Sequence, residues 1–168
     1  DNIMIGNSAG KVSTASHLIM IGTTAGQSNT SGAKNIFIGA EAGKTNQTGA
    51  NNVYVGYNTG ITSTTSNNIF IGTEAGKENT LGEKNIMIGT TAGHQNRVGI
   101  SNICIGYNSG LNTTGSNNIN IGGGSGELNQ PGGSNINIGT TAGYNNLTGQ
   151  YNICIGEKSG LNNTQDSN

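Results

Sequence analysis

A short phrase recurs along the whole chain, Asn-Ile-x-Ile-Gly-x-x-[Ala/Ser/Thr]-Gly, and each copy is followed by seven or eight variable, mostly polar residues. The glycine that closes the Ile-x-Ile triplet occurs ten times between Gly6 and Gly156, at intervals of sixteen or seventeen positions. Self-similarity at a short, fixed period indicates a repeat architecture in which each unit stacks on the next. The ten copies fill residues 1–168 and predict a single repeat domain.

The composition fits this interpretation once the period is taken into account. Asn, Gly, Thr and Ser make up 92 of the 168 residues, which in an aperiodic chain would be typical of disorder. A glycine every few residues excludes helix, because each would cost about 1 kcal/mol there. Of the 20 isoleucines, 18 occupy the two Ile positions of the triplet, and β-branched residues suit an extended strand. The repeats are therefore predicted to be β-structure.

A repeat of this length is too short for a helix-containing unit but fits one coil of a slim solenoid. Each coil would contain the Ile strand, a glycine turn, a second extended run and a return turn. Coils stack about 4.8 Å apart, so ten of them would form a rod of roughly 48 Å. We therefore predict an all-β fold, a β-solenoid (parallel β-roll) of ten coils. The Asn that precedes nine of the ten strands is expected to hydrogen-bond along the rod.

The residue between the two Ile positions forms a column of its own, which we call the middle column. Alternation along a strand sends it to the face opposite the isoleucines, so we predict that the isoleucines fill the coil and that the middle column faces outward. An apolar stripe of this length is seldom left to water, which predicts that the sheet packs against copies of itself around an axis. Three chains, as a homotrimeric fibre, are a natural number for such a rod, although the stripe does not itself fix the number. The column consists of Met4, Met20, Phe37, Tyr54, Phe70, Met87, Cys104, Asn120, Asn137 and Cys154.

Two details of the middle column carry predictions of their own. Asn120 and Asn137 would either hold water or an anion among symmetry-related side chains, or mark a core that opens to solvent. Cys104 and Cys154 lie three coils apart, about 14 Å by the stacking estimate. A disulfide needs Cα atoms within about 7 Å, so no bond between these two cysteines is expected within one chain.

The spacing of the repeats has a longer period as well, because 16-17-17 recurs as a 50-residue unit. Its short member carries an apolar residue after the second glycine in three copies, at Ile61, Leu111 and Leu161. One explanation is duplication of a block of three coils. The other is a three-sided coil that spans one whole 16-17-17 unit, in which the middle column would point into the chain's own interior and no partner would be needed.

Several classes of function are disfavoured by what the chain lacks. Charged residues are 9% of the total, the net charge is −1 and there is a single arginine, so no basic surface for nucleic acid is expected. No apolar run is long enough for a membrane span. Calcium-binding β-rolls need an aspartate in every coil, and this chain has two in all. No cofactor is predicted.

The remaining ionisable residues do not suggest catalysis. His17 and His94 fall in different columns and cannot share a metal ion. Glu41 and Glu74 share a column but lie two coils apart, about 10 Å along the rod, where they are expected to be solvated. We therefore predict that the chain is not an enzyme.

The stretches "NIFIGTEAGKENTLGEK" and "NICIGYNSGLNTTGSN" resemble Asn/Gly-rich arrays of phage and bacterial tail-fibre and surface proteins. "NIFIGAEAG" is also similar to the head repeats of trimeric autotransporter adhesins, although the period here is longer and the middle residue larger. The resemblance covers the whole chain. It implies a left-handed parallel β-roll, assembly as a trimer, attachment to host surfaces and a location outside the cell, on its surface or on a virion. No binding residue carries over from it.

The leading functional hypothesis is a non-catalytic structural or attachment module of such a fibre, cut from a longer protein. Its partners would be further copies of itself and a cell-surface protein or glycan. The large side chains available for that contact are Tyr57, Tyr107, Tyr144 and Tyr151.

Ice binding is the alternative, but flat ladders of Thr are missing, since Ala40, Tyr57 and Glu157 interrupt the Thr columns. A purely architectural filament is the third possibility.

Overall fold

The computed structural model describes residues 1–163 as a β-solenoid, and residues 164–168 of the predicted repeat domain lie outside the described part. Each coil contributes one short strand, and coil 1 to coil 10 are numbered here by the strand they contain. None of the described residues is helical. The strands are β1 (Asn2–Ile5), β2 (Leu18–Ile21), β3 (Ile36–Ile38), β4 (Val53–Val55), β5 (Ile69–Ile71), β6 (Ile86–Ile88), β7 (Ile103–Ile105), β8 (Ile119–Ile121), β9 (Ile136–Ile138) and β10 (Ile153–Ile155).

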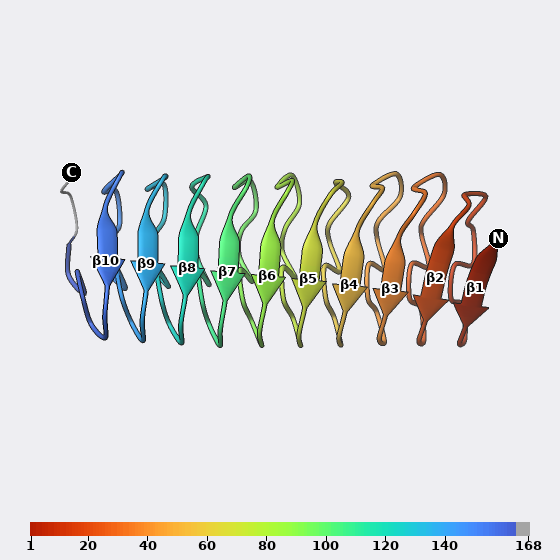
Figure 1. Cartoon of the computed structure of the whole chain (residues 1–168). Coiled ribbons are helices and arrows are strands. Elements are labelled where there is room, and N and C mark those ends of the chain that lie inside the picture. The colour runs from red at the N-terminus through yellow and green to blue at the C-terminus, as the bar shows by residue number, and fades with distance from the viewer. Residues whose placement is uncertain (164–168) are drawn as a thin grey trace.

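The ten strands form one parallel sheet in chain order, with every strand next to its neighbours in sequence (Figure 1). The register joins equivalent residues of consecutive repeats, as in the pairs Ile36↔Val53 and Phe37↔Tyr54. One repeat therefore makes one coil, and the predicted solenoid is confirmed. The three-sided coil is wrong, because its strands would pair with the third repeat along and not with the next.

Each coil closes through backbone conformations that the sequence supplies locally. In coil 3 the strand is followed directly by Gly39, whose φ of 132° is strained for any residue with a Cβ, and the turn ends at Gly43 with a φ of 56°. Glu41 between them also has a positive φ, of 62°. Equivalent residues repeat these conformations in the other coils, which explains the two invariant glycines of the phrase.

The middle column lies inside the coil, and the prediction that it faces outward to other chains is wrong. Nine of its members are buried within a single chain, and only Met4, in the first coil, is partly exposed. The isoleucines on either side point outward instead. The nine buried residues are Met20, Phe37, Tyr54, Phe70, Met87, Cys104, Asn120, Asn137 and Cys154.

The narrowness of the coil explains this orientation. The side chain of Phe37 reaches across the interior to the opposite wall, where a Cβ on Gly43 would lie 2.8 Å from the ring. Ala42, next to that glycine, is also fully buried. Besides the Asn residues at its corners, the interior of coil 3 thus holds one large apolar side chain and one small one, which leaves the isoleucine pair on the outside.

Inside the rod the middle column forms a continuous stack. The rings of Phe37 and Tyr54 lie 4.9 Å apart and those of Tyr54 and Phe70 lie 4.8 Å apart, all nearly parallel. These centroid distances match the spacing of the strands, so the register of the sheet sets the stacking. The buried Tyr54 hydroxyl donates a hydrogen bond to Ser63 Oγ at 2.8 Å.

The Asn residues that precede the strands form a second buried stack, as expected. The side-chain oxygen of each accepts a hydrogen bond from the backbone N–H of the next, for example from Asn102 to Asn85 at 2.8 Å. The Asn85 amide also donates to the Gly99 carbonyl at 2.8 Å. The bonds thus run mainly between side chain and backbone, and they satisfy backbone groups buried at this corner.

Short and long coils differ at one corner only. In long coils a buried Asn closes the corner, as when Asn79 Nδ2 donates to the Gly82 carbonyl at 2.8 Å. In the short coil 4 the equivalent residue is Ser63, and the corner is one residue shorter. Asn79 Nδ2 also donates to Ser63 Oγ at 3.3 Å, which links the two kinds of coil. The three-coil period therefore reflects the length of this corner.

Candidate interaction surfaces

A long apolar surface lies on the outer side of the sheet, and we call it the isoleucine face. It consists of the two outward residues of each strand, which the parallel register places in two straight columns. Its members are Ile3, Ile5, Ile19, Ile21, Ile36, Ile38, Val53, Val55, Ile69, Ile71, Ile86, Ile88, Ile103, Ile105, Ile119, Ile121, Ile136, Ile138, Ile153 and Ile155.

The isoleucine face is partly open to water along its whole length. At the centre Ile69 and Ile71 are each 38% exposed, and in the last coil Ile153 is 69% exposed. The other central members are half-buried, because the side chains above and below cover part of each. No charged residue lies among the twenty. This surface was not predicted from the sequence, because the isoleucines were expected to fill the coil.

Polar residues border the isoleucine face at both ends of the strands. Before each strand a column of residues with positive φ includes His17, Lys34 and Lys84. Beyond the glycine that ends each strand lies a column that includes Tyr57 and Tyr107. Both borders are largely exposed. The apolar stripe is thus bounded by groups that water solvates well.

The structure does not bring the four predicted tyrosines together. Tyr57 and Tyr107 share one column, three coils apart, and both are exposed. Tyr151 is exposed at the other border of the isoleucine face, and Tyr144 is half-buried in a third column near Glu127. Only Tyr57 and Tyr107 can therefore contact one extended ligand from the same side.

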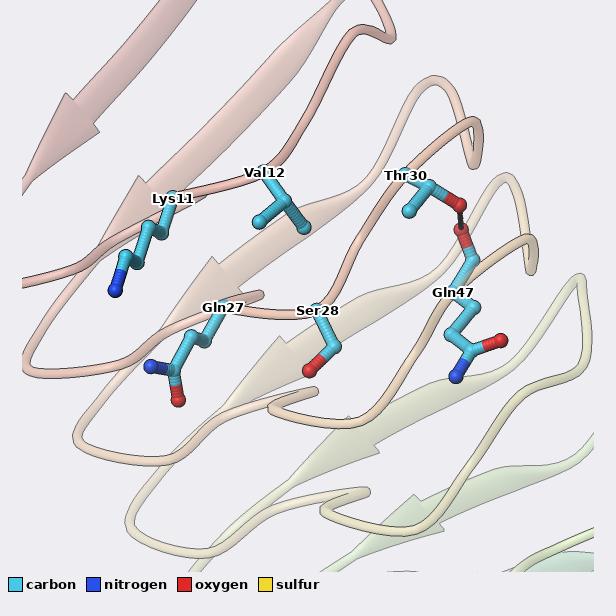
Figure 2. A pocket seen from close by; sticks show the side chains of 6 residues that line it. All are labelled: Lys11, Val12, Gln27, Ser28, Thr30 and Gln47. Carbon is cyan, nitrogen blue, oxygen red and sulfur yellow. Dashed lines mark hydrogen bonds between the residues drawn. The ribbon is translucent and has the colours of Figure 1, made fainter.

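A shallow polar groove runs over coils 1 to 3 on another side of the rod (Figure 2). The Thr30 hydroxyl at one edge donates to the Gln47 carbonyl at 2.9 Å, so its hydrogen is already engaged. The groove offers amide, hydroxyl and ammonium groups to solvent without enclosing them. Its lining residues are Lys11, Val12, Gln27, Ser28, Thr30 and Gln47.

Glu41 and Glu74 share a column, as predicted, and each pairs with the lysine three residues on. The Lys77–Glu74 distance is 2.8 Å and the Lys44–Glu41 distance is 3.3 Å. His94 Nε2 lies 3.4 Å from the other Glu74 oxygen. The hydrogen bond from Lys77 lowers the pKa of Glu74. These contacts form surface ion pairs, and no group of three metal-ligating side chains occurs within residues 1–163.

Cys104 and Cys154 are free, buried thiols in coils 7 and 10, three coils apart as predicted. Burial raises the pKa of the Cys104 thiol to about 12. Asn120 Nδ2 approaches Cys104 Sγ at 3.8 Å, and Asn137 Nδ2 donates to Asn120 Oδ1 at 2.9 Å. These two Asn residues lie inside one chain, so the predicted site among symmetry-related Asn side chains is wrong, and so is a core opening to solvent.

The Thr pairs do not form a flat array. Thr23 is exposed, whereas the Oγ1 of Thr24 is buried. Thr24, Thr91 and Thr141 all have positive φ and lie in a column apart from their exposed neighbours. The array expected of an ice-binding surface is thus missing from the Thr columns.

Protein families, curated proteins and solved structures yield no significant match to this chain. Among the described residues there is no helix long and apolar enough to cross a membrane.

Proposed function

We propose that this chain is a rigid, non-catalytic rod module of an extracellular or virion-surface fibre, acting in attachment or as a shaft. The observation that supports it best is the stacking of ten coils by three parallel sets of contacts: the sheet, the middle column and the Asn stack. The first two run from one end of the described chain to the other, and the Asn stack is interrupted at Leu18 alone. Such a rod separates its ends at a fixed distance.

The surface chemistry is consistent with a passive role. Glu41 and Glu74 form half-exposed ion pairs with lysine, which do not provide the paired acid and base that hydrolysis would need. The thiols are buried and protonated, hence poor nucleophiles. Attachment would use the broad exposed columns, with a cell-surface protein or glycan as the partner. Tyr57 and Tyr107 are the aromatic groups best placed for a glycan.

Immunogold electron microscopy tests the location. Antibodies against the folded chain should label fibres on the outside of the cells or virions that carry the protein. Labelling confined to the cell interior would contradict the proposal.

A binding assay tests attachment. The Tyr57→Ala/Tyr107→Ala double variant should bind extracted surface glycans several-fold more weakly than the unaltered chain, whereas Tyr151→Ala, at the other border, should bind unchanged. Equal binding by all three would favour a shaft without receptor contact.

Ice binding is a second candidate because the isoleucine face presents two regular columns of apolar side chains. A thermal hysteresis measurement distinguishes ice binding from the fibre proposal. Clear hysteresis at micromolar protein would favour ice binding over the fibre.

A further inference from the structure

We propose that the isoleucine face is the surface through which copies of this chain associate, one isoleucine face packed against another. The proposal concerns the two outward columns of the sheet and not the middle column, which is already covered within each chain. It goes beyond the fibre proposal, because a rod could serve as a shaft without a partner on this face.

The size of the face is the first argument. Ten strands at about 4.8 Å and three residues at about 3.3 Å give a footprint of roughly 480 Å² per chain. This lies within the range of about 300–600 Å² for the largest apolar patch on a typical monomer, and such patches often have a function. Two faces with their borders would bury about 1,000 Å², close to the lower limit for a stable interface.

The period of the face is the second argument, and it identifies the occupant. Isoleucine side chains recur at every strand with the strand spacing, and the register keeps them in straight columns. Another parallel stack with the same spacing can fill the grooves between them at every coil. A globular partner would contact a few coils and leave the rest exposed. A second copy of this chain is therefore the occupant that fits the entire surface.

The borders of the face are compatible with such packing. None of the twenty apolar residues is charged, so packing two faces together would not remove a charged group from water at the centre of the interface. Lys34 and Lys84 lie at the edge, where they can remain in water. The arrangement is that of a common interface, with an apolar centre and a polar rim.

Sedimentation equilibrium at several concentrations tests the proposal. The mass should be twice the 17.0 kDa of one chain. The variant Ile88→Thr/Ile105→Thr keeps β-branched residues in coils 6 and 7 and should weaken association at least tenfold. The control, Leu81→Thr/Val98→Thr, removes two exposed apolar side chains from another side of the rod and should leave the mass unchanged.

Cysteine cross-linking provides a second measurement that does not depend on the stability of the threonine variant. In a parallel assembly Ile21→Cys and Ile138→Cys should each cross-link to themselves. In an antiparallel one only a mixture of the two should react, because coil 2 then faces coil 9. Either pattern would support the proposal.

A folded chain of single mass would overturn it, as would the absence of cross-links in all three samples or equal effects of the two threonine variants. The immunogold result would still stand, so failure of this inference is separate from failure of the fibre proposal. A single mass together with thermal hysteresis would assign the face to ice.

Discussion

At the residue scale, the second invariant glycine of each coil meets two requirements at once. Gly43 has a φ of 56°, and a Cβ there would lie 2.8 Å from the Phe37 ring. Glu41 has a similar φ but lies outside the interior, so a side chain is tolerated there. The glycine is therefore fixed by lack of space as well as by backbone conformation, whereas residues of positive φ at the surface are free to vary.

Gly43→Ala should lower the free energy of unfolding by about 2–4 kcal/mol, through left-handed strain and overpacking of the core. Equilibrium denaturation in urea measures the change. Gly123→Ala is the control, since the Tyr107 carbonyl oxygen would lie 4.0 Å from the added Cβ and Ala40 occupies the equivalent position in coil 3. A loss below about 0.5 kcal/mol for Gly43→Ala, like that of a neutral surface change, would contradict this account of the glycine.

The buried Cys104 thiol should make the free energy of unfolding fall in alkali, because burial raises its pKa from 9.0 to about 12. The thiol of the unfolded chain ionises near its ordinary pKa, whereas that of the folded chain stays protonated. The folded state therefore binds the extra proton, and stability falls as the pH rises from 9 toward 12. Burial raises the pKa of Tyr54 as well, with the same sign.

Urea titrations between pH 8 and 11 measure the slope of the free energy of unfolding against pH. Cys104→Ser should reduce it by up to about 1.4 kcal/mol per pH unit, the amount for one proton. An unchanged slope would mean that the thiol is not shielded in the folded state.

At the element scale, the strands, their parallel order and the coil length all follow from the sequence, because the period and the β-branched triplets specify them. Which side of the strand faces inward does not follow from alternation, since Ile36, Phe37 and Ile38 are all apolar. The signal that could have decided it is the width of the coil. A coil this narrow has room for one large apolar side chain beside the buried Asn residues of its corners, so the single middle residue belongs inside and the isoleucine pair outside.

The Asn stack joins one coil to the next. Removing one of its side chains should lower the free energy of unfolding, because backbone groups lose their hydrogen bonds. Asn85→Ala deprives the buried Asn102 N–H of its acceptor. The Gly99 carbonyl loses one of its two amide donors and keeps the one from Asn96. We expect a loss of about 1–3 kcal/mol, the amount for one buried group left unpaired.

Thermal and urea unfolding measure the loss for Asn85→Ala. Thr73→Ala, an exposed site in the neighbouring coil 5, is the control and should change stability by less than about 0.5 kcal/mol. If the two variants were equally stable, the stack would have no part in holding the coils together.

At the scale of the whole molecule, the two halves of the rod differ in what fills them. Coils 2 to 6 hold Met, Phe or Tyr in the middle column, whereas coils 8 and 9 hold Asn120 and Asn137. The Oδ1 of Asn137 is buried and has no hydrogen-bond partner among the described residues. The later coils therefore gain less from burial of apolar surface, and they should exchange amide hydrogens faster than the earlier ones.

Replacing both Asn residues by Met should strengthen the later half. Coil 9 carries the same Thr-Thr-Ala-Gly turn as coil 6, where Met87 is fully buried, so the space for Met exists. We expect Asn120→Met/Asn137→Met to raise the free energy of unfolding by about 1–3 kcal/mol, because burial of a Met side chain contributes on this order. Slower hydrogen exchange in coils 8 and 9 would accompany it. Destabilisation would show that the paired amides stabilise these coils better than apolar packing.

The one-residue difference between short and long coils has a consequence for how much the chain can be extended. The corner at which they differ lies outside the sheet, the middle column and the Asn stack, and long coils place exposed residues such as Ser31, Thr48 and Leu81 there. A loop inserted at this corner would project from the rod without shifting any strand pairing. Peptides placed on successive coils would then be displayed at fixed intervals set by the strand spacing, about 4.8 Å.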